Sequence, residues 1–192
     1  MGVESLQLSA WGDESMREVG GISHYLLGVV VAEDSRCDEL RERMRELHTR
    51  GPKLHWRDLE GAEQARVIAS IAAFDAYHVV VVGAPVNPRK QERARALCIQ
   101  RMLWELERQG VTRLTLESRG RSLDGADMRT VERMRGAQSL GRSLRVFHAL
   151  PSGEPMLWVA DQTLGAYGES IANRSQFFEP IRSATTIVDI RL

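Results

Sequence analysis

The sequence predicts an α/β protein in which a mixed β-sheet is covered by helices. Short apolar runs rich in β-branched residues, at 24–32 and 78–86, alternate with segments whose apolar residues recur at helical spacing. The glycine pair Gly20-Gly21 separates the first two apolar runs, as in a hairpin turn. The chain has 192 residues without repeats or a linker, which favours a single domain over 1–192.

Strands are expected where apolar residues run continuously or alternate. The runs HYLLGVVVA and HVVVVGAPV are apolar throughout, as in strands covered on both faces. A last run, ATTIVDI, is expected at a sheet edge. The expected strands are 6–11, 24–32, 78–86, 112–118, 143–150 and 184–190.

Helices are expected between these strands, and several carry end signals. Ser35 is a candidate cap for the first helix, which Gly51-Pro52 would end. A polar loop is expected at 119–125. The strand–helix–strand units predict parallel pairing, whereas the opening hairpin makes the first strands antiparallel. The expected helices are 36–50, 61–74, 87–108, 126–138 and 155–172.

The charge balance does not indicate a nucleic-acid binder, because 26 basic and 26 acidic residues cancel. The balance does not exclude a local basic face on the surface. Only Lys53 and Lys90 are lysines; the arginine excess suits phosphate binding but also follows from a GC-rich genome. No apolar run approaches the roughly 20 residues of a membrane span, and no signal peptide is seen. With only two cysteines, the expected location is the cytoplasm.

Three acidic positions stand out. Asp13 and Glu14 are expected just beyond the first strand, Glu117 at the end of the fourth, and Asp161 inside an apolar helix. A lone buried carboxylate costs several kcal/mol unless it is paired or metal-bound. If the first and fourth strands are neighbours, Asp13, Glu117 and Asp161 would form a cluster of oxygen ligands for Mg²⁺ or Mn²⁺. Glu14 takes a supporting role, because adjacent strand residues point to opposite faces.

A structural interpretation of the same acids stays open. Asp13 would then belong to a turn, Glu117 would cap the following loop, and Asp161 would pair with an arginine.

Four further residues are candidates for contacts with substrate. His55 is a candidate proton shuttle or phosphate contact, or it orders its loop by hydrogen bonding. Trp56 lies in a loop expected to be exposed, where it could stack on a base. Lys53 could contact a phosphate or be a solvated lysine. Arg119 follows Glu117 closely and is expected beside the acids, where it could hold a phosphate.

Three short segments carry a family resemblance. AWGDES, KLHWRDL and LWVADQTLGAY, in this order, resemble the microbial family called domain of unknown function 3800, which is similar in fold to ribonuclease H and the retroviral integrases. The resemblance implies a ribonuclease-H-like fold and brings in Lys53 and His55 through the mid-chain Lys-x-His segment. The remaining matches are Asp13, Glu14, Ser15, Ala160, Asp161 and Gly165.

Together these observations predict a divalent-metal-dependent nuclease or a related phosphodiester hydrolase, with DNA or RNA as a possible substrate. Its metal ligands would be Asp13, Glu117 and Asp161. The alternative is a non-catalytic nucleic-acid or protein interaction module on the same fold. The sequence indicates neither the substrate nor the oligomeric state.

Overall fold

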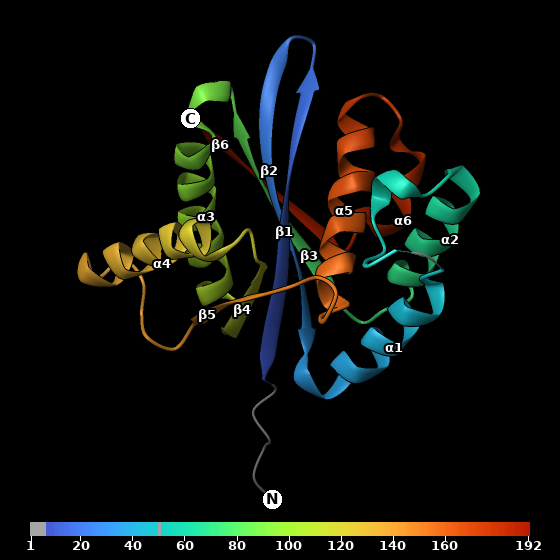
Figure 1. The fold of residues 1–192 in the computed structure, drawn as a ribbon, viewed down its shortest axis with the longest axis horizontal. Coiled ribbons are helices and arrows are strands. Elements are labelled where there is room, and N and C mark those ends of the chain that lie inside the picture. Colours follow the sequence, from blue (N-terminus) through green and yellow to red (C-terminus); the bar gives the residue numbers. More distant parts are fainter. Residues whose placement is uncertain (1–6, 50) are drawn as a thin grey trace, which may run out of the picture.

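The computed structural model describes residues 7–49 and 51–192. Within them the chain forms a six-stranded sheet of order β5-β4-β1-β2-β3-β6, with helices on both faces (Figure 1). The strands are β1 (Leu8–Val19), β2 (Ile22–Glu33), β3 (Tyr77–Ala84), β4 (Val111–Glu117), β5 (Arg145–Ala149) and β6 (Thr185–Arg191). The helices are α1 (Cys37–Leu47), α2 (Gly61–Ala72), α3 (Gln91–Arg108), α4 (Arg121–Gly136), α5 (Met156–Ile171) and α6 (Glu179–Arg182). The expected mixed sheet flanked by helices is confirmed.

The β1–β2 hairpin is the centre of the sheet, and its first strand is longer than expected. Gly20 and Gly21 form the turn with φ of 58° and 77°, the left-handed region that two-residue hairpin turns require. The prediction that the strand ends at Trp11 is wrong, because β2 pairs with β1 as far as Val19. Asp13 therefore lies inside the strand and not beyond it. Residue 6, the expected start, lies outside the described residues.

The other pairings explain how distant acids can meet. β4 is parallel to β1, so the first and fourth strands are neighbours, as the prediction required. β5 is parallel to β4, whereas β3 is antiparallel to β2. β6 is parallel to β3 and forms the expected edge strand. The end of β4 at Glu117 consequently lies beside the middle of β1.

Each face of the sheet has an apolar layer that packs against its own set of helices. α3 and α4 pack on one face, and α1, α2, α5 and α6 on the other (Figure 1). Side chains of β2 alternate between them: Leu27 and Val29 join the α3 layer, and Leu26 and Val30 the α5 layer. The same alternation in β1 sends Asp13 and Glu14 to opposite faces of the sheet.

A glycine in β2 lets α5 lie close to the sheet. A Cβ atom added at Gly28 would lie 2.7 Å from Leu164 of α5, so any larger residue would push the helix away. Gly28 pairs with Asp13 across the hairpin. Close packing at this point therefore brings Asp161 of the same helix turn toward Asp13.

Helix α4 begins at Arg121, five residues before its expected start, so most of the expected loop 119–125 is helical. Gly120, with φ of 96°, makes the entry into the helix. Among the described residues, no helix combines the length and the apolar character needed to cross a membrane.

Candidate functional site

Three carboxylates from separate elements meet in one cavity of about 220 Å³. Asp13 comes from the middle of β1, Glu117 from the last position of β4, and Asp161 from the second turn of α5. Lys53 and His55, from the segment between α1 and α2, also line the cavity. Glu14 and Trp56 also contribute to the lining, so the structure brings together every candidate site residue of the sequence except Arg119.

Asp13 has a strongly shifted pKa. Its side chain is buried, with 7% of the residue exposed. Burial, followed by the charges of Glu117 and Asp161, raises the pKa of Asp13 well above its usual range. Its Oδ1 accepts one hydrogen bond, 2.7 Å from the main-chain nitrogen of Glu14. A carboxylate in this state is stabilised by any additional positive charge that enters the cavity.

Lys53 provides positive charge to this cluster. Its Nζ lies 2.9 and 3.0 Å from the two carboxylate oxygens of Glu117. Burial alone would lower the pKa of Lys53, but the charge of Asp13 and the hydrogen bond to Glu117 raise it. The ammonium group therefore stays charged and compensates for part of the acidic cluster.

Asp161 is held by the segment that carries His55. Its Oδ2 lies 2.7 Å from the main-chain nitrogen of Trp56, which donates a hydrogen bond, and its Oδ1 lies 3.0 Å from Nδ1 of His55. This hydrogen bond with Asp161 raises the pKa of His55, against the lowering effect of burial. The expectation that Asp161 is buried is confirmed, since 8% of the residue is exposed.

Trp56 does not occupy the exposed position expected of it. Only 3% of the residue is exposed, and its ring lies 5.5 Å from that of Phe177 in an edge-on arrangement. Gly165 of α5 leaves room for the indole, because a Cβ there would overlap it. Stacking of Trp56 on a base is therefore excluded in this conformation. The buried ring instead anchors the segment that presents His55 to Asp161.

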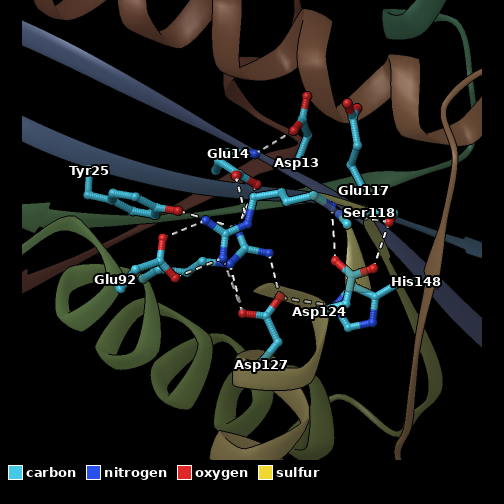
Figure 2. Close-up of polar contacts among 12 residues, drawn as sticks. Asp13, Glu14, Tyr25, Glu92, Glu117, Ser118, Asp124, Asp127 and His148 are labelled. Atoms are coloured by element: carbon cyan, nitrogen blue, oxygen red, sulfur yellow. Dashed lines mark hydrogen bonds and ion pairs between the residues drawn. The ribbon is translucent and has the colours of Figure 1, made fainter. Parts of the chain in front are cut away.

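A second polar network lies on the opposite face of the sheet, directly behind the cavity. Figure 2 shows Asp13 and Glu117 pointing to one side and Asp127 to the other. Arg95 of α3, with 1% of its surface exposed, lies 2.9 and 2.7 Å from the two carboxylate oxygens of Asp127. It also donates to Glu14 at 2.6 Å. The pKa of Glu14 is raised, because the effect of burial exceeds the lowering effect of Arg95 and Arg119. Glu14 thus ties β1 to α3, and Arg95 continues the network to Asp127 of α4.

Arg119 belongs to this second network. It lies 3.3 Å from Glu14 and 2.7 Å from Glu92, and it does not line the acidic cavity. Arg119 therefore lies beside Glu14 and outside the cavity, and its role in holding a phosphate stays a prediction. It lies there because β4 ends at Glu117 and the chain then passes to the α3 side, where Glu14 and Glu92 bind the guanidinium group.

The sequence analysis did not single out the buried pair of Arg95 and Asp127. Burial would raise the pKa of Asp127, but hydrogen bonds from Arg95 and His148 lower it to about 2. A signal was present in the sequence. Arg95 precedes Cys98 and Ile99 by three and four residues, so it lies on the apolar stripe of α3, where a charge needs a partner.

The donor chemistry of the cavity suits a hard divalent cation, because three carboxylates converge there. The side chains as they lie do not form a finished metal site. Within residues 7–49 and 51–192, no group of three or more His, Cys, Asp and Glu side chains is placed to hold a metal ion. Glu117 is bound by Lys53, and Asp161 by His55 and Trp56.

No protein-family model matches the chain, and no curated protein matches it. The resemblance to domain of unknown function 3800 therefore stays a prediction. A solved structure, described as the PCNA:RNase HII complex from Archaeoglobus fulgidus, is similar with a TM-score of 0.47 and 16% sequence identity. The similar region covers 93% of this chain and 77% of that chain. Any activity has to be inferred from the side chains themselves.

Proposed function

We propose that the protein is a divalent-metal-dependent nuclease or a related phosphodiester hydrolase. One observation carries this proposal: Asp13, Glu117 and Asp161 converge from β1, β4 and α5 in a single cavity. Such an arrangement is costly without a cation, as the raised pKa of Asp13 indicates. Functional sites commonly keep perturbed groups of this kind.

The carboxylates of Asp13, Glu117 and Asp161 would hold Mg²⁺ or Mn²⁺. The ion would supply an activated water and would stabilise the negative charge on a leaving oxygen. For Glu117 to serve as a ligand, Lys53 has to release it. The freed ammonium group, on a flexible side chain, is then available to bind a substrate phosphate.

His55 is the candidate proton donor. Its hydrogen bond with Asp161 raises its pKa, so it holds a proton more strongly than a free histidine does. The ring lines the cavity and is anchored through the neighbouring main chain of Trp56. Glu14 serves the site from the far face, where Arg95 fixes the part of β1 that presents Asp13.

Thermal melting in the presence of Mn²⁺ or Mg²⁺ tests this proposal. The wild-type melting temperature should rise with metal concentration, because an ion that binds only the folded state stabilises it. Asp161→Asn should abolish the shift. Asp75→Asn, an exposed acid outside the cavity, is the matched control and should keep it. Wild-type protein without any metal-linked shift would contradict the proposal.

Asp161→Asn also removes hydrogen bonds to Trp56 and His55. A second variant is therefore needed to separate metal binding from these structural contacts. Glu117→Gln serves this purpose, because the side chain that it changes contacts only Lys53 among the hydrogen bonds described. Loss of the metal shift in a folded Glu117→Gln protein supports the metal site independently of Asp161.

A non-catalytic nucleic-acid or protein interaction module is the second candidate. It is favoured by the fact that Lys53 and His55 already compensate Glu117 and Asp161. The acids would then be structural, and Asp161→Asn should prevent folding. A folded Asp161→Asn protein that has lost only metal binding would exclude this alternative. For either candidate, the free and buried thiols of Cys37 and Cys98 fit the reducing cytoplasm.

A further inference from the structure

The acidic cavity has a second, basic end. Arg17 and Arg57 line it together with the three carboxylates. Arg17 follows Asp13 by four residues in β1, so both side chains lie on the α5 face of the sheet. At a rise of roughly 3.3 Å per residue, their Cα atoms are about 13 Å apart. The cavity therefore presents negative charge at one end and positive charge at the other.

Arg17 is half-buried and incompletely satisfied. Its Nε is buried, and among the described residues no group accepts a hydrogen bond from it. Burial and the like charge of Arg57 lower the pKa of Arg17. Of the nearby acids, Glu169 already pairs with Arg174, at 2.5 Å, and Asp161 with His55, at 3.0 Å. Arg17 and the exposed side chain of Arg57 thus place two positive charges at one end of the cavity. The two acids near Arg17 have other partners.

Helix α5 provides the space for this arrangement. Gly168 lies against the guanidinium end of Arg17, and a Cβ at this position would overlap Nε. The absence of a side chain at residue 168 therefore allows Arg17 to lie along the helix and into the cavity. An ordinary surface arginine would extend into solvent, where its charge is hydrated at little cost.

We propose that Arg17 and Arg57 form a subsite for a second phosphate group of a nucleic-acid strand, next to the group bound at the carboxylates. This inference rests on the proposed function, since it takes the acidic end as the place of reaction. Guanidinium groups bind phosphate oxygens through paired hydrogen bonds, which would satisfy the free Nε of Arg17.

The subsite gives the bound strand a direction. From Asp13 the strand follows β1 past Ser15 to Arg17, toward the hairpin turn at Gly20-Gly21. Phosphate contacts of this kind position a strand but do not read its sequence. Binding should therefore depend on Arg17 for strands of any base composition.

Fluorescence anisotropy with a short single-stranded oligonucleotide, in buffer containing EDTA, tests the subsite without metal. Arg17→Met should weaken binding roughly tenfold and lower the slope of log affinity against log salt by about 0.7. Gly168→Ala keeps every charge but displaces the guanidinium group, and it should weaken binding in the same direction. Arg133→Met, at an exposed site on α4 across the sheet, is the control and should bind as the wild type does.

Wild-type affinity in both Arg17→Met and Gly168→Ala, or no binding by the wild type, would overturn the inference. Competition by inorganic phosphate identifies the source of the group. If inorganic phosphate competes weakly and the competition depends on Arg17, the subsite binds a phosphate group of a strand. If it competes as strongly as an unlabelled oligonucleotide does, the ligand is free phosphate, and the inference is overturned. A metal-linked melting shift without Arg17-dependent binding contradicts only the subsite. Arg17-dependent binding without a metal-linked melting shift contradicts only the metal-dependent function.

Discussion

Nζ of Lys53 lies between the two carboxylate oxygens of Glu117, at 2.9 and 3.0 Å, where a cation would otherwise be needed. The side chains of both residues are mostly buried, with 19% and 17% exposed. The ammonium group therefore compensates the acidic cavity in the absence of metal, and the stability of the protein should depend on it.

Lys53→Met should lower stability in EDTA by about 2 kcal/mol, or roughly 4–8 °C in Tm, because Glu117 and Asp13 lose their nearest positive charge. Added Mn²⁺ should restore more stability to this variant than to the wild type. Lys90→Met, at an exposed lysine outside this cavity, is the control. A variant as stable as the wild type in EDTA would show that Lys53 does not compensate the acids.

Asp13→Asn should stabilise the protein at neutral pH. The raised pKa of Asp13 means that its ionised form is disfavoured in the folded state, so the wild type loses stability as pH rises above the unfolded value near 3.8. A neutral amide removes this cost and should raise Tm by about 2–4 °C. Melting curves across pH provide the check: the advantage should disappear in acid. Destabilisation at neutral pH would contradict this account of the cavity.

Asp127→Asn should be strongly destabilising, by about 3–5 kcal/mol, because it removes the bidentate partner of the buried Arg95. Urea denaturation measures the loss. Asp124→Asn, at a less buried acid of the same helix that bonds Ser118, is the comparison and should cost less. Equal losses of stability in the two variants would mean that the buried Arg95–Asp127 pair stabilises the protein no more than the contacts of Asp124 do.

His78 should make the protein sensitive to acid. Burial lowers the pKa of His78 to about 4 from an ordinary value of 6.5, so the unfolded chain takes up a proton first as pH falls. Stability should therefore decrease by about 3 kcal/mol between pH 6.5 and pH 4. His78→Asn should lack this component, and denaturation curves of the two proteins at both pH values measure the difference. Parallel losses in both would contradict it.

The three acids of the cavity could be predicted because each is unusual at its place in the sequence. Asp161 interrupts an apolar helix, and Glu117 ends an apolar strand. A buried carboxylate requires a partner, and the parallel pairing of β1 with β4 brings these partners together. Gly28 also carried a signal, since a glycine inside an apolar strand marks a close approach of another element.

The length of β1 and the second network could not be predicted in the same way. Asp13, Glu14 and Ser15 look like the end of a strand, yet β2 pairs with them and Arg95 satisfies Glu14. The contact between Glu14 and Arg95 joins residues 81 positions apart, which a local sequence pattern does not reveal. Trp56 likewise resembles an exposed loop residue until Gly165 and Phe177 are placed against it.

A crystal soaked in Mn²⁺ and measured for anomalous scattering tests the central claim most directly. The account predicts anomalous density bound by the carboxylates of Asp13, Glu117 and Asp161, with Nζ of Lys53 moved away from Glu117. A cavity without anomalous density, in which Lys53 still holds both oxygens of Glu117, would contradict it.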